Sequence, residues 1–210
     1  MCGASMTLSL FDDEPPIELI NYDGKVTCWQ QLLPEHEALA LLDELIKTSH
    51  WQQEEIEVYN KRHLQPRLTA WYGDYGVIAD GGYKKLYQTV YFTPLLLALK
   101  TKIEVMTGYR FNCVLANLYR DGQDSVGYHA DNEKILGINP VIASYSLGAT
   151  RRFALKHYRE SSLNLTCELH HNSLLLMQGA LQHYWQHSLV KTQRKVAPRI
   201  NLTFRLVKAS

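Results

Sequence analysis

The second half of the chain is a series of short apolar runs separated by turn residues, and this spacing restricts the fold more than any other feature. The runs, all from Phe111 onward, are FNCVLANLY, PVIASYSLG, RRFALKH, LTCELHHNSLLLMQ and PRINLTFRLV. They are rich in β-branched and aromatic residues, which is typical of β-strands. Several such strands at this spacing predict an all-β sandwich or barrel.

Two amphipathic segments precede most of these runs. Pro34 to Ile46 begins with a proline and acids, and Thr93 to Thr107 opens with Thr-Pro and is followed by Gly108, so both segments carry helix start or stop signals. The predicted apolar stripes are Leu39, Leu42, Leu45 and Ile46 in the first helix, and Leu96, Leu97, Leu99, Ile103 and Met106 in the second. We therefore predict an α+β, mainly β fold in which two helices buttress one sheet.

Composition describes an ordinary globular chain. Its 210 residues suit one domain, and its formal charge of +1 means that any nucleic-acid surface must be local. The four cysteines are scattered without a CxxC pair, which favours a reducing cytosol over a disulfide framework. No segment approaches the roughly 18 apolar residues of a membrane span. FDDEPP predicts a flexible tail over residues 1–20, with the folded domain over 21–210, starting near Asn21.

The stretch GYHADNE places His129 and Asp131 one residue apart, after a strand-like run. A polar turn is the usual explanation of a lone HxD. Non-haem Fe(II) oxygenases, however, hold iron with two histidines and one carboxylate on one face. Such a site needs a second, distant histidine, and His187 lies between two predicted strands. His183 is its competitor, whereas His170 and His171 precede a turn-like Asn172 and suit structural roles.

The run RINLTFR ends the strand series with a polar and an apolar face. Side chains of a strand alternate, so Arg199, Asn201, Thr203 and Arg205 share one face, opposite Ile200, Leu202 and Phe204. An amphipathic edge strand would explain this pattern. If the polar face lines a barrel, its two guanidinium groups need anions, and a dicarboxylate such as 2-oxoglutarate would pair with both.

Together, these motifs resemble the AlkB family of Fe(II)/2-oxoglutarate dioxygenases that repair alkylated DNA. The resemblance rests on WYGD, NLYRDG, SVGYHAD, IASYSLGATRRF and PRINLTFR, and it covers Asn21 to Lys208. It implies a double-stranded β-helix (jelly roll). It also implies the following site residues: His129, Asp131 and His187 for iron, and Asn117, Tyr119, Arg199, Asn201 and Arg205 for 2-oxoglutarate. Within this set, Arg199 is expected to meet the distal carboxylate. Strand-end hydrogen bonding and core packing are the alternatives for Asn117 and Tyr119.

The implied reaction oxidises an N-methyl group of a base such as 1-methyladenine or 3-methylcytosine. It consumes 2-oxoglutarate and O2 and yields succinate, carbon dioxide and formaldehyde. The base must leave the duplex stack to be reached. An N-terminal hairpin, IEVYNKRH, resembles the family's element that enters the duplex, and Val58 and Tyr59 are candidate wedges. Cross-strand packing is the alternative for both residues.

Contacts to DNA must come from local basic clusters. The candidate phosphate contacts are Arg62, His63, Arg67, Arg151, Arg152, Lys191, Arg194 and Lys195. The substrate-binding set is predicted to be Tyr59, Arg67, Tyr72 and Glu133, with Tyr75 and Tyr83 as further stacking candidates. The chain departs from the family pattern at Asn132, where an acid is common, and after WYGD, where an aromatic-Ser-Gly stretch is missing. These departures concern the preferred base.

Two alternatives remain open. One is a dioxygenase of the same fold that acts on RNA, protein or a small molecule, and the other is a β-barrel binding module without turnover. We expect a monomer with no membrane association that binds alkylated DNA, with RNA as the alternative partner. The expected location is the cytoplasm, or the nucleus in a eukaryote.

Overall fold

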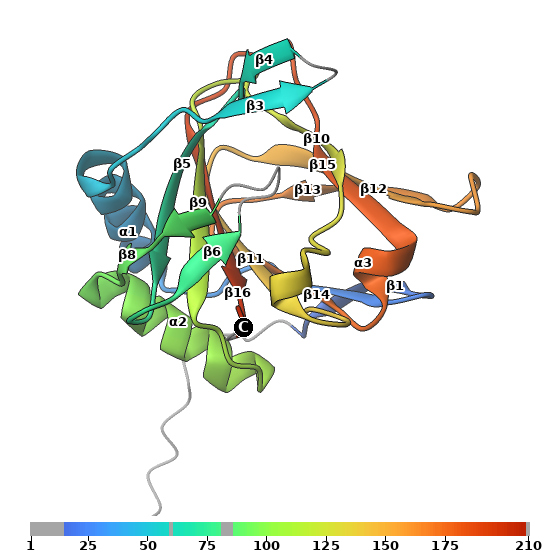
Figure 1. Ribbon diagram of the computed structural model, residues 1–210, viewed down its shortest axis with the longest axis horizontal. Helices are drawn as coiled ribbons and strands as arrows, with labels where there is room; N and C mark the ends of the chain where they lie inside the picture. The colour runs from blue at the N-terminus through green and yellow to red at the C-terminus, as the bar shows by residue number, and fades with distance from the viewer. Residues whose placement is uncertain (1–14, 59–60, 81–85, 209–210) are drawn as a thin grey trace, which may run out of the picture.

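The computed structural model describes residues 15–58, 61–80 and 86–208 of the chain. Two β-sheets face each other, and two helices cover the outer side of the larger sheet (Figure 1). This arrangement confirms the predicted mainly β fold with two buttressing helices. In the described part of the chain, no helix combines the length and apolarity that a bilayer crossing requires.

The larger sheet has eight strands in the order β1-β2-β14-β11-β16-β9-β5-β8. Its strands are β1 (Ile17–Asn21), β2 (Lys25–Trp29), β5 (Leu68–Gly73), β8 (Val90–Tyr91), β9 (Cys113–Tyr119), β11 (Ile142–Gly148), β14 (Ser173–Gln178) and β16 (Arg199–Arg205). All pairs are antiparallel except β5 with β8. The C-terminal strand β16 therefore lies centrally, between β11 and β9, which excludes the edge-strand explanation of RINLTFR.

The smaller sheet has the order β10-β15-β12-β13. Its strand β10 ends at His129, the first residue of the HxD motif. Its strands are β10 (Val126–His129), β12 (Arg151–His157), β13 (Asn164–Leu169) and β15 (Trp185–Leu189). Two separate hairpins complete the β-structure: β3 (Glu55–Val58) with β4 (Lys61–Leu64), and β6 (Ile78–Asp80) with β7 (Leu86–Gln88). The β3–β4 hairpin stands over the open end of the sandwich (Figure 1).

The two main helices are α1 (Glu35–Thr48) and α2 (Pro94–Thr107), close to their predicted bounds. The Thr93 side chain accepts a hydrogen bond from the Leu96 amide, and Gly108 ends α2 with φ of 76°. The predicted stripes are partly wrong. Leu39 is 51% exposed and Leu97 is 48% exposed, while Leu41 is buried in α1. The apolar residues of ALALLDELI fill more than one stripe, so the sheet, not the periodicity, decides which stripe is buried.

Two short helical segments complete the fold: α3 (Leu181–Tyr184) and a 3₁₀ turn over Lys134–Leu136.

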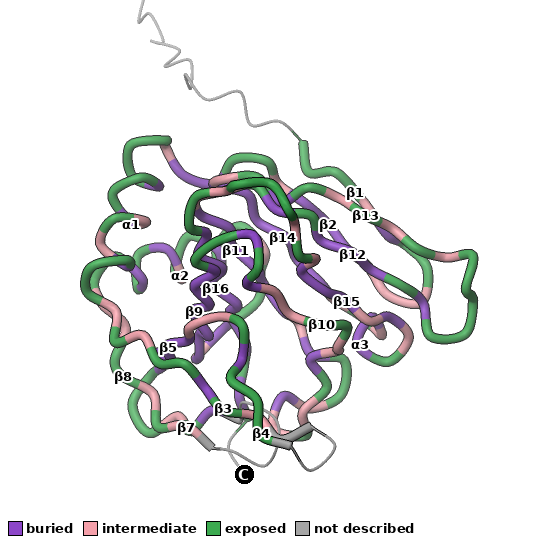
Figure 2. Tube along the Cα trace, turned by 90° about the horizontal axis from the view of Figure 1, so that it is seen from above, coloured by how far each residue is buried: buried purple, intermediate pink, exposed green. Residues whose placement is uncertain are grey.

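Apolar side chains form two layers, one on each face of the larger sheet. The outer layer joins the sheet to the helices and includes Tyr145, Ile200 and Phe204, while the inner layer joins the two sheets and includes Ile142 and Phe153. Figure 2 shows buried strands in both sheets and a largely exposed path through β4. The inner layer is interrupted where polar residues of β9, β10, β15 and β16 converge.

The sheet begins earlier than the expected boundary at Asn21. Strand β1 pairs with β2 from Ile17↔Cys28 onward, so part of the segment predicted as a tail belongs to the larger sheet. The turn between these strands contains Asp23 and Gly24, both with positive φ. Asp-Gly between apolar runs is a hairpin signal that the neighbouring acids and prolines obscured. Residues 1–14 lie outside the described residues.

Candidate metal and co-substrate site

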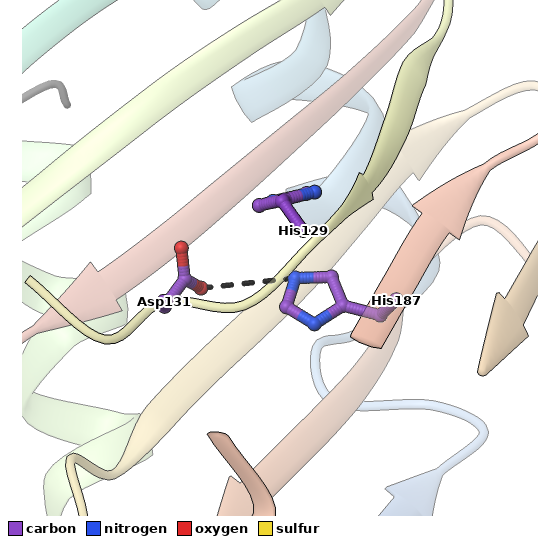
Figure 3. A group of neighbouring side chains, drawn as sticks. All are labelled: His129, Asp131 and His187. Carbon is purple, nitrogen blue, oxygen red and sulfur yellow. Dashed lines mark ion pairs between the residues drawn. The ribbon is translucent and has the colours of Figure 1, made fainter. Parts of the chain in front are cut away.

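His129, Asp131 and His187 lie together where the smaller sheet opens toward the larger one. His129 ends β10, Asp131 follows two residues later, and His187 is the cross-strand partner of His129 on β15. One ligand atom from each residue lies within 4.8 Å of the other two, and His187 Nε2 is 3.9 Å from Asp131 Oδ2 (Figure 3). The competing His183 is exposed on α3 and is not part of this group.

The two imidazoles are suited to bind a metal in their neutral form. His129 Nδ1 donates to the Gly127 carbonyl at 2.9 Å, because a carbonyl can only accept, and this leaves the lone pair of Nε2 available. Burial, reinforced by the neighbouring His129 and Arg205, lowers the pKa of His187 to about 3, even though Asp131 acts in the opposite direction. His187 is therefore neutral at physiological pH, as a metal ligand must be.

Asp131 supplies the anionic ligand. Burial alone would raise the pKa of Asp131, but the Arg205 guanidinium and the two imidazoles outweigh it and hold the pKa below its ordinary value. Arg205 Nη2 donates to Oδ1 at 2.7 Å, and the Asp131 amide donates to Gln182 Oε1 at 2.9 Å. Oδ2 is thereby turned toward His187. Two imidazoles and one carboxylate on a single face form the ligand set of non-haem Fe(II) oxygenases.

A cavity of about 450 Å³ opens beside this group. Of the residues predicted from sequence, the following line it: Arg67, Asn117, Tyr119, His129, Asp131, Glu133, His187, Arg199, Asn201 and Arg205. Its volume is within the range of small-molecule sites. The structure therefore brings the predicted metal and co-substrate residues into one space.

One end of the cavity carries a buried cation, the guanidinium of Arg199. Arg199 is 2% exposed, its Nη2 donates to Ser146 Oγ at 2.9 Å, and its guanidinium carbon lies 5.4 Å from the Tyr119 ring centroid. Burial lowers the pKa of Arg199 to about 10, so the side chain remains protonated at neutral pH. Among the described residues its Nε has no hydrogen-bond partner.

No carboxylate within the described ranges forms an ion pair with Arg199. A buried charge is costly unless it is paired. This end of the cavity therefore fits the distal carboxylate of 2-oxoglutarate.

Polar residues of β11 and β16 form part of the wall between the cation and the metal group. Asn201 Nδ2 donates to Ser144 Oγ at 2.7 Å, and Thr203 Oγ1 donates to Asn201 Oδ1 at 3.0 Å. Sequence reasoning missed Ser144 and Ser146, although the alternation in IASYSLG places them on the face opposite Tyr145. Sequence reasoning also missed Gln182, and no sequence pattern singles it out.

Arg67 belongs to this wall rather than to an exposed phosphate-binding surface. Its Nε donates to Asn117 Oδ1 at 2.9 Å, and the side chain is only partly exposed. Asn117 and Thr69 are cross-strand partners on β9 and β5, so the hydrogen bond spans the strands that bound the cavity. The observed position favours a role in shaping the cavity.

The predicted stacking role of Tyr72 is wrong. Tyr72 is buried in the outer apolar layer, on the helix side of the larger sheet. Because side chains alternate along β5, it is Trp71 that faces the inner layer, where its ring stacks on Tyr87 at 5.4 Å and lies 5.8 Å from the Arg205 guanidinium carbon. Tyr75 is 86% exposed, stacks on Tyr91 and does not line the cavity, and Tyr83 lies outside the described residues.

The basic candidates divide into exposed and buried residues. Those that are exposed are Arg62, His63, Arg152, Lys191, Arg194 and Lys195. Arg151 is 3% exposed, and its guanidinium donates to backbone carbonyls, so its predicted role as a phosphate contact is wrong. Strand alternation turns Arg151 inward and its neighbour Arg152 outward, which a run of two arginines does not reveal.

Two other sets of predicted residues have clear positions. His171 Nδ1 accepts from the Gly148 amide at 2.8 Å, and the imidazole of His170 contacts Thr150 Oγ1 at 3.1 Å, so both histidines stabilise a turn.

Ile56 of the β3–β4 hairpin and Gln65 just after it line the cavity. The Val58 side chain and Tyr59 lie outside the described residues.

Comparisons with known proteins agree with this geometry. The profile of a family described as the 2OG-Fe(II) oxygenase superfamily matches residues 25–205. The chain is 39% identical over 181 residues to alpha-ketoglutarate-dependent dioxygenase alkB homolog 3 of Bos taurus, covering 81% of this chain and 62% of that protein. It is 37% identical over 203 residues to DNA oxidative demethylase ALKBH2 of Arabidopsis thaliana, covering 85% of this chain and 65% of that protein. The chain thus spans slightly less than two thirds of these relatives.

A solved structure, "The structure of OsALKBH1", is similar with a TM-score of 0.67 and 14% sequence identity, covering 91% of this chain and 100% of that one. At this identity the likeness concerns the fold alone, and it supports the jelly-roll arrangement of the two sheets.

Proposed function

The chain belongs to the 2OG-Fe(II) oxygenase superfamily, and we propose that it is an oxidative demethylase of N-alkylated bases in DNA, of the 1-methyladenine and 3-methylcytosine type. The observation that carries the proposal is the placement of the His129, Asp131 and His187 group in the same cavity as the buried guanidinium of Arg199, which forms no ion pair with any described residue. A metal and a dicarboxylate fit the two ends of this cavity.

The chain's own residues bind and orient the reacting groups. His129, Asp131 and His187 would hold Fe(II), and Arg205 keeps the Asp131 carboxylate turned so that Oδ2 faces His187. Arg199 would bind the distal carboxylate of 2-oxoglutarate, with Tyr119, Asn117 and Asn201 along its length. When bound, Fe(II) with 2-oxoglutarate and O2 supplies the oxidation of an N-methyl group, giving succinate, carbon dioxide and a hydroxymethyl base that releases formaldehyde.

The proposal of a nucleic-acid substrate is supported by the names of the relatives and by the residues that line the cavity. One of the similar proteins is named a DNA oxidative demethylase. A base must leave its stack to reach an enclosed site, and a methylated base that cannot pair leaves at the lowest cost. The hairpin residue Ile56 and the partly buried Glu133 line the same cavity as the metal group. We propose Glu133 as a contact of the flipped base and the hairpin as the element that meets the strand.

Mass spectrometry of oligonucleotides tests this proposal. Single-stranded and duplex DNA carrying one 1-methyladenine, 3-methylcytosine or etheno lesion is incubated with the protein, iron, ascorbate and 2-oxoglutarate. We expect restoration of the unmodified base and equimolar succinate, and neither product when 2-oxoglutarate is omitted. Methylated RNA of the same sequence is included in the panel. Repair of the RNA but not of the DNA would make RNA the substrate. Succinate formation without base repair would mean that neither nucleic acid is the substrate.

A further inference from the structure

Arg151 is a second buried arginine at the co-substrate end of the cavity. It opens β12 and is 3% exposed. Its guanidinium donates to the carbonyls of Asp121 at 2.9 Å and of Asp124 and Val190 at 2.8 Å. Its Nε has no hydrogen-bond partner among the described residues. Carbonyl oxygens satisfy the donors of Arg151 but carry no net charge, so they do not neutralise it.

The residues around Arg151 place it directly behind the cavity wall. Its strand partner Leu169 lines the cavity, and so does Leu189, next to the carbonyl of Val190. The carbonyls of Asp121 and Asp124 belong to the turn that follows Tyr119, the cross-strand partner of Arg199. The Tyr119 phenol acts on the pKa of both arginines, and the charge of Arg151 contributes to lowering the pKa of Arg199.

Two buried aspartates of this region form ion pairs with other arginines. Asp124 binds Arg120 through two hydrogen bonds, at 2.8 and 2.9 Å, and Asp131 binds Arg205 at 2.7 Å. Within the described part of the chain, neither Arg151 nor Arg199 forms an ion pair. In the described part of the chain, the end of the cavity around Tyr119 therefore carries two buried arginines without an ion-pair partner, and the charges of Asp124 and Asp121 act on Arg151 only from beyond ion-pair distance.

We propose that Arg151 is a positioning residue for the co-substrate, whose charge adds to that of Arg199 and makes the site select 2-oxo acids with a distal carboxylate. Arg151 does not touch the co-substrate, because it does not line the cavity and its two Nη atoms donate to backbone carbonyls. It acts through the electrostatic potential at the wall that Tyr119 and Arg199 form. The inference rests on the co-substrate of the proposed function and is independent of the nucleic-acid substrate.

The variants Arg151→Gln and Arg151→Lys separate charge from anchoring. Glutamine keeps an NH₂ donor for the carbonyls and removes the charge, whereas lysine keeps the charge and loses the guanidinium fork. Arg152→Gln is the matched control, since Arg152 is the exposed neighbour on the same strand. Thermal unfolding of each variant verifies that the cavity wall is intact.

Binding is measured by isothermal titration of 2-oxoglutarate into the full chain loaded with Mn(II), without nucleic acid. Competition with 2-oxopentanoate gives the affinity of a 2-oxo acid that lacks the distal carboxylate. Arg151→Gln should weaken 2-oxoglutarate binding roughly tenfold, because the variant removes one of the two positive charges that act on the distal carboxylate. Binding of 2-oxopentanoate should be unchanged, and the lysine variant and the Arg152→Gln control should retain most of the wild-type affinity.

Equal weakening for both ligands, or equal loss in the glutamine and lysine variants, would make Arg151 a structural anchor and overturn the proposal. Unchanged 2-oxoglutarate affinity in Arg151→Gln would also overturn it. If the wild-type protein bound no 2-oxoglutarate, the co-substrate of the proposed function would be at fault. If it bound 2-oxoglutarate but repaired no DNA, only the nucleic-acid substrate would be in error.

Discussion

At the scale of single residues, Asp131 has two tasks that depend on its two oxygens. Oδ1 accepts a hydrogen bond from Arg205, and Oδ2 faces His187. The buried Arg205 thus needs Asp131 for its own charge balance, and the candidate metal needs the same carboxylate. Removing the side chain would break this buried ion pair, which typically costs about 3 to 5 kcal/mol. An alanine variant therefore mixes loss of metal binding with loss of stability.

Asp131→Asn is the sharper variant, because the amide keeps an oxygen for Arg205 and nearly the same volume. We expect iron binding and turnover to fall by at least about 100-fold, since the anionic ligand is lost, while the chain still folds. Metal content by mass spectrometry and unfolding in urea measure the two effects separately. Asp43→Asn, at an exposed carboxylate on α1, is the control and should change neither. Full activity in Asp131→Asn would exclude Asp131 as a ligand.

At the scale of secondary-structure elements, the buried side chains of Asn172 and Glu104 hold the segments next to the two helices. Asn172 acts at α1. Asn172, with φ of 65°, lies in the turn between β13 and β14. Its Oδ1 accepts from the Leu33 amide at 2.9 Å and from Tyr145 Oη at 2.7 Å, and its Nδ2 donates to the Leu33 carbonyl at 2.7 Å. These bonds fix the segment that leads into α1.

Asn172→Ala should lower the free energy of unfolding by about 3 kcal/mol, because several buried polar groups lose their partners. Asn172→Gly tests the cause, since glycine accepts a positive φ without strain but restores no hydrogen bond. We expect the two variants to be destabilised to a similar degree, as measured by chemical denaturation. A glycine variant as stable as the wild type would mean that backbone conformation, not hydrogen bonding, explains the choice of asparagine.

Glu104 performs the corresponding task at the end of α2. Burial alone would raise the pKa of Glu104, but the Phe111 amide at 2.8 Å, Lys100 and Arg110 outweigh it and lower the pKa. A carboxyl group whose pKa is depressed on folding stabilises the protein above its unfolded pKa, about 4.3 for glutamate, and loses this contribution as the pH falls.

The difference in unfolding free energy between the wild type and Glu104→Gln should therefore be largest near neutral pH and shrink between about pH 5 and pH 3. Urea unfolding at a series of pH values measures it. Glu168→Gln, at an exposed position on β13, is the control and should show little difference at any pH. A difference for Glu104→Gln that stayed constant with pH would assign its role to packing.

At the scale of the whole molecule, the proposed nucleic-acid substrate requires local charge, because the chain is nearly neutral overall. The exposed basic residues of the loop after β15, Lys191, Arg194 and Lys195, are the strongest candidates. Gly122 packs against this loop so closely that an added Cβ would lie 2.5 Å from the Thr192 carbonyl oxygen, and the Thr192 amide donates to the Gly122 carbonyl at 2.9 Å. The basic loop is thus fixed to the turn beside the cavity.

Truncating Lys195 should reduce the salt dependence of DNA binding. Each phosphate neutralised on duplex DNA contributes about −0.9 to the slope of log K against log salt concentration, so Lys195→Ala should lower the slope by about one and weaken all sequences alike. Fluorescence anisotropy at several salt concentrations measures this. Lys102→Ala, on the exposed side of α2, is the control and should leave the slope unchanged. Equal slopes in the wild type and both variants would mean that Lys195 does not contact a phosphate.

The sequence by itself determined the features that depend on neighbours along the chain. The ends of α2 follow from Thr93, Pro94 and Gly108, and the two faces of β16 follow from strand alternation, because capping and alternation are local properties of the backbone. The family resemblance supplied the metal and co-substrate residues, which the described structure places in one cavity.

Only the tertiary structure decided which of two possible faces each side chain presents, and what it meets there. Tyr72 is predicted from sequence to contact the substrate, but the pairing of β5 with β9 turns Tyr72 toward the helices and its neighbour Trp71 toward the inner layer. Arg151 and Arg152 are chemically identical, yet one is buried against carbonyls and the other is exposed. Local periodicity predicts that two faces exist. Which face is buried depends on packing against segments distant in the chain.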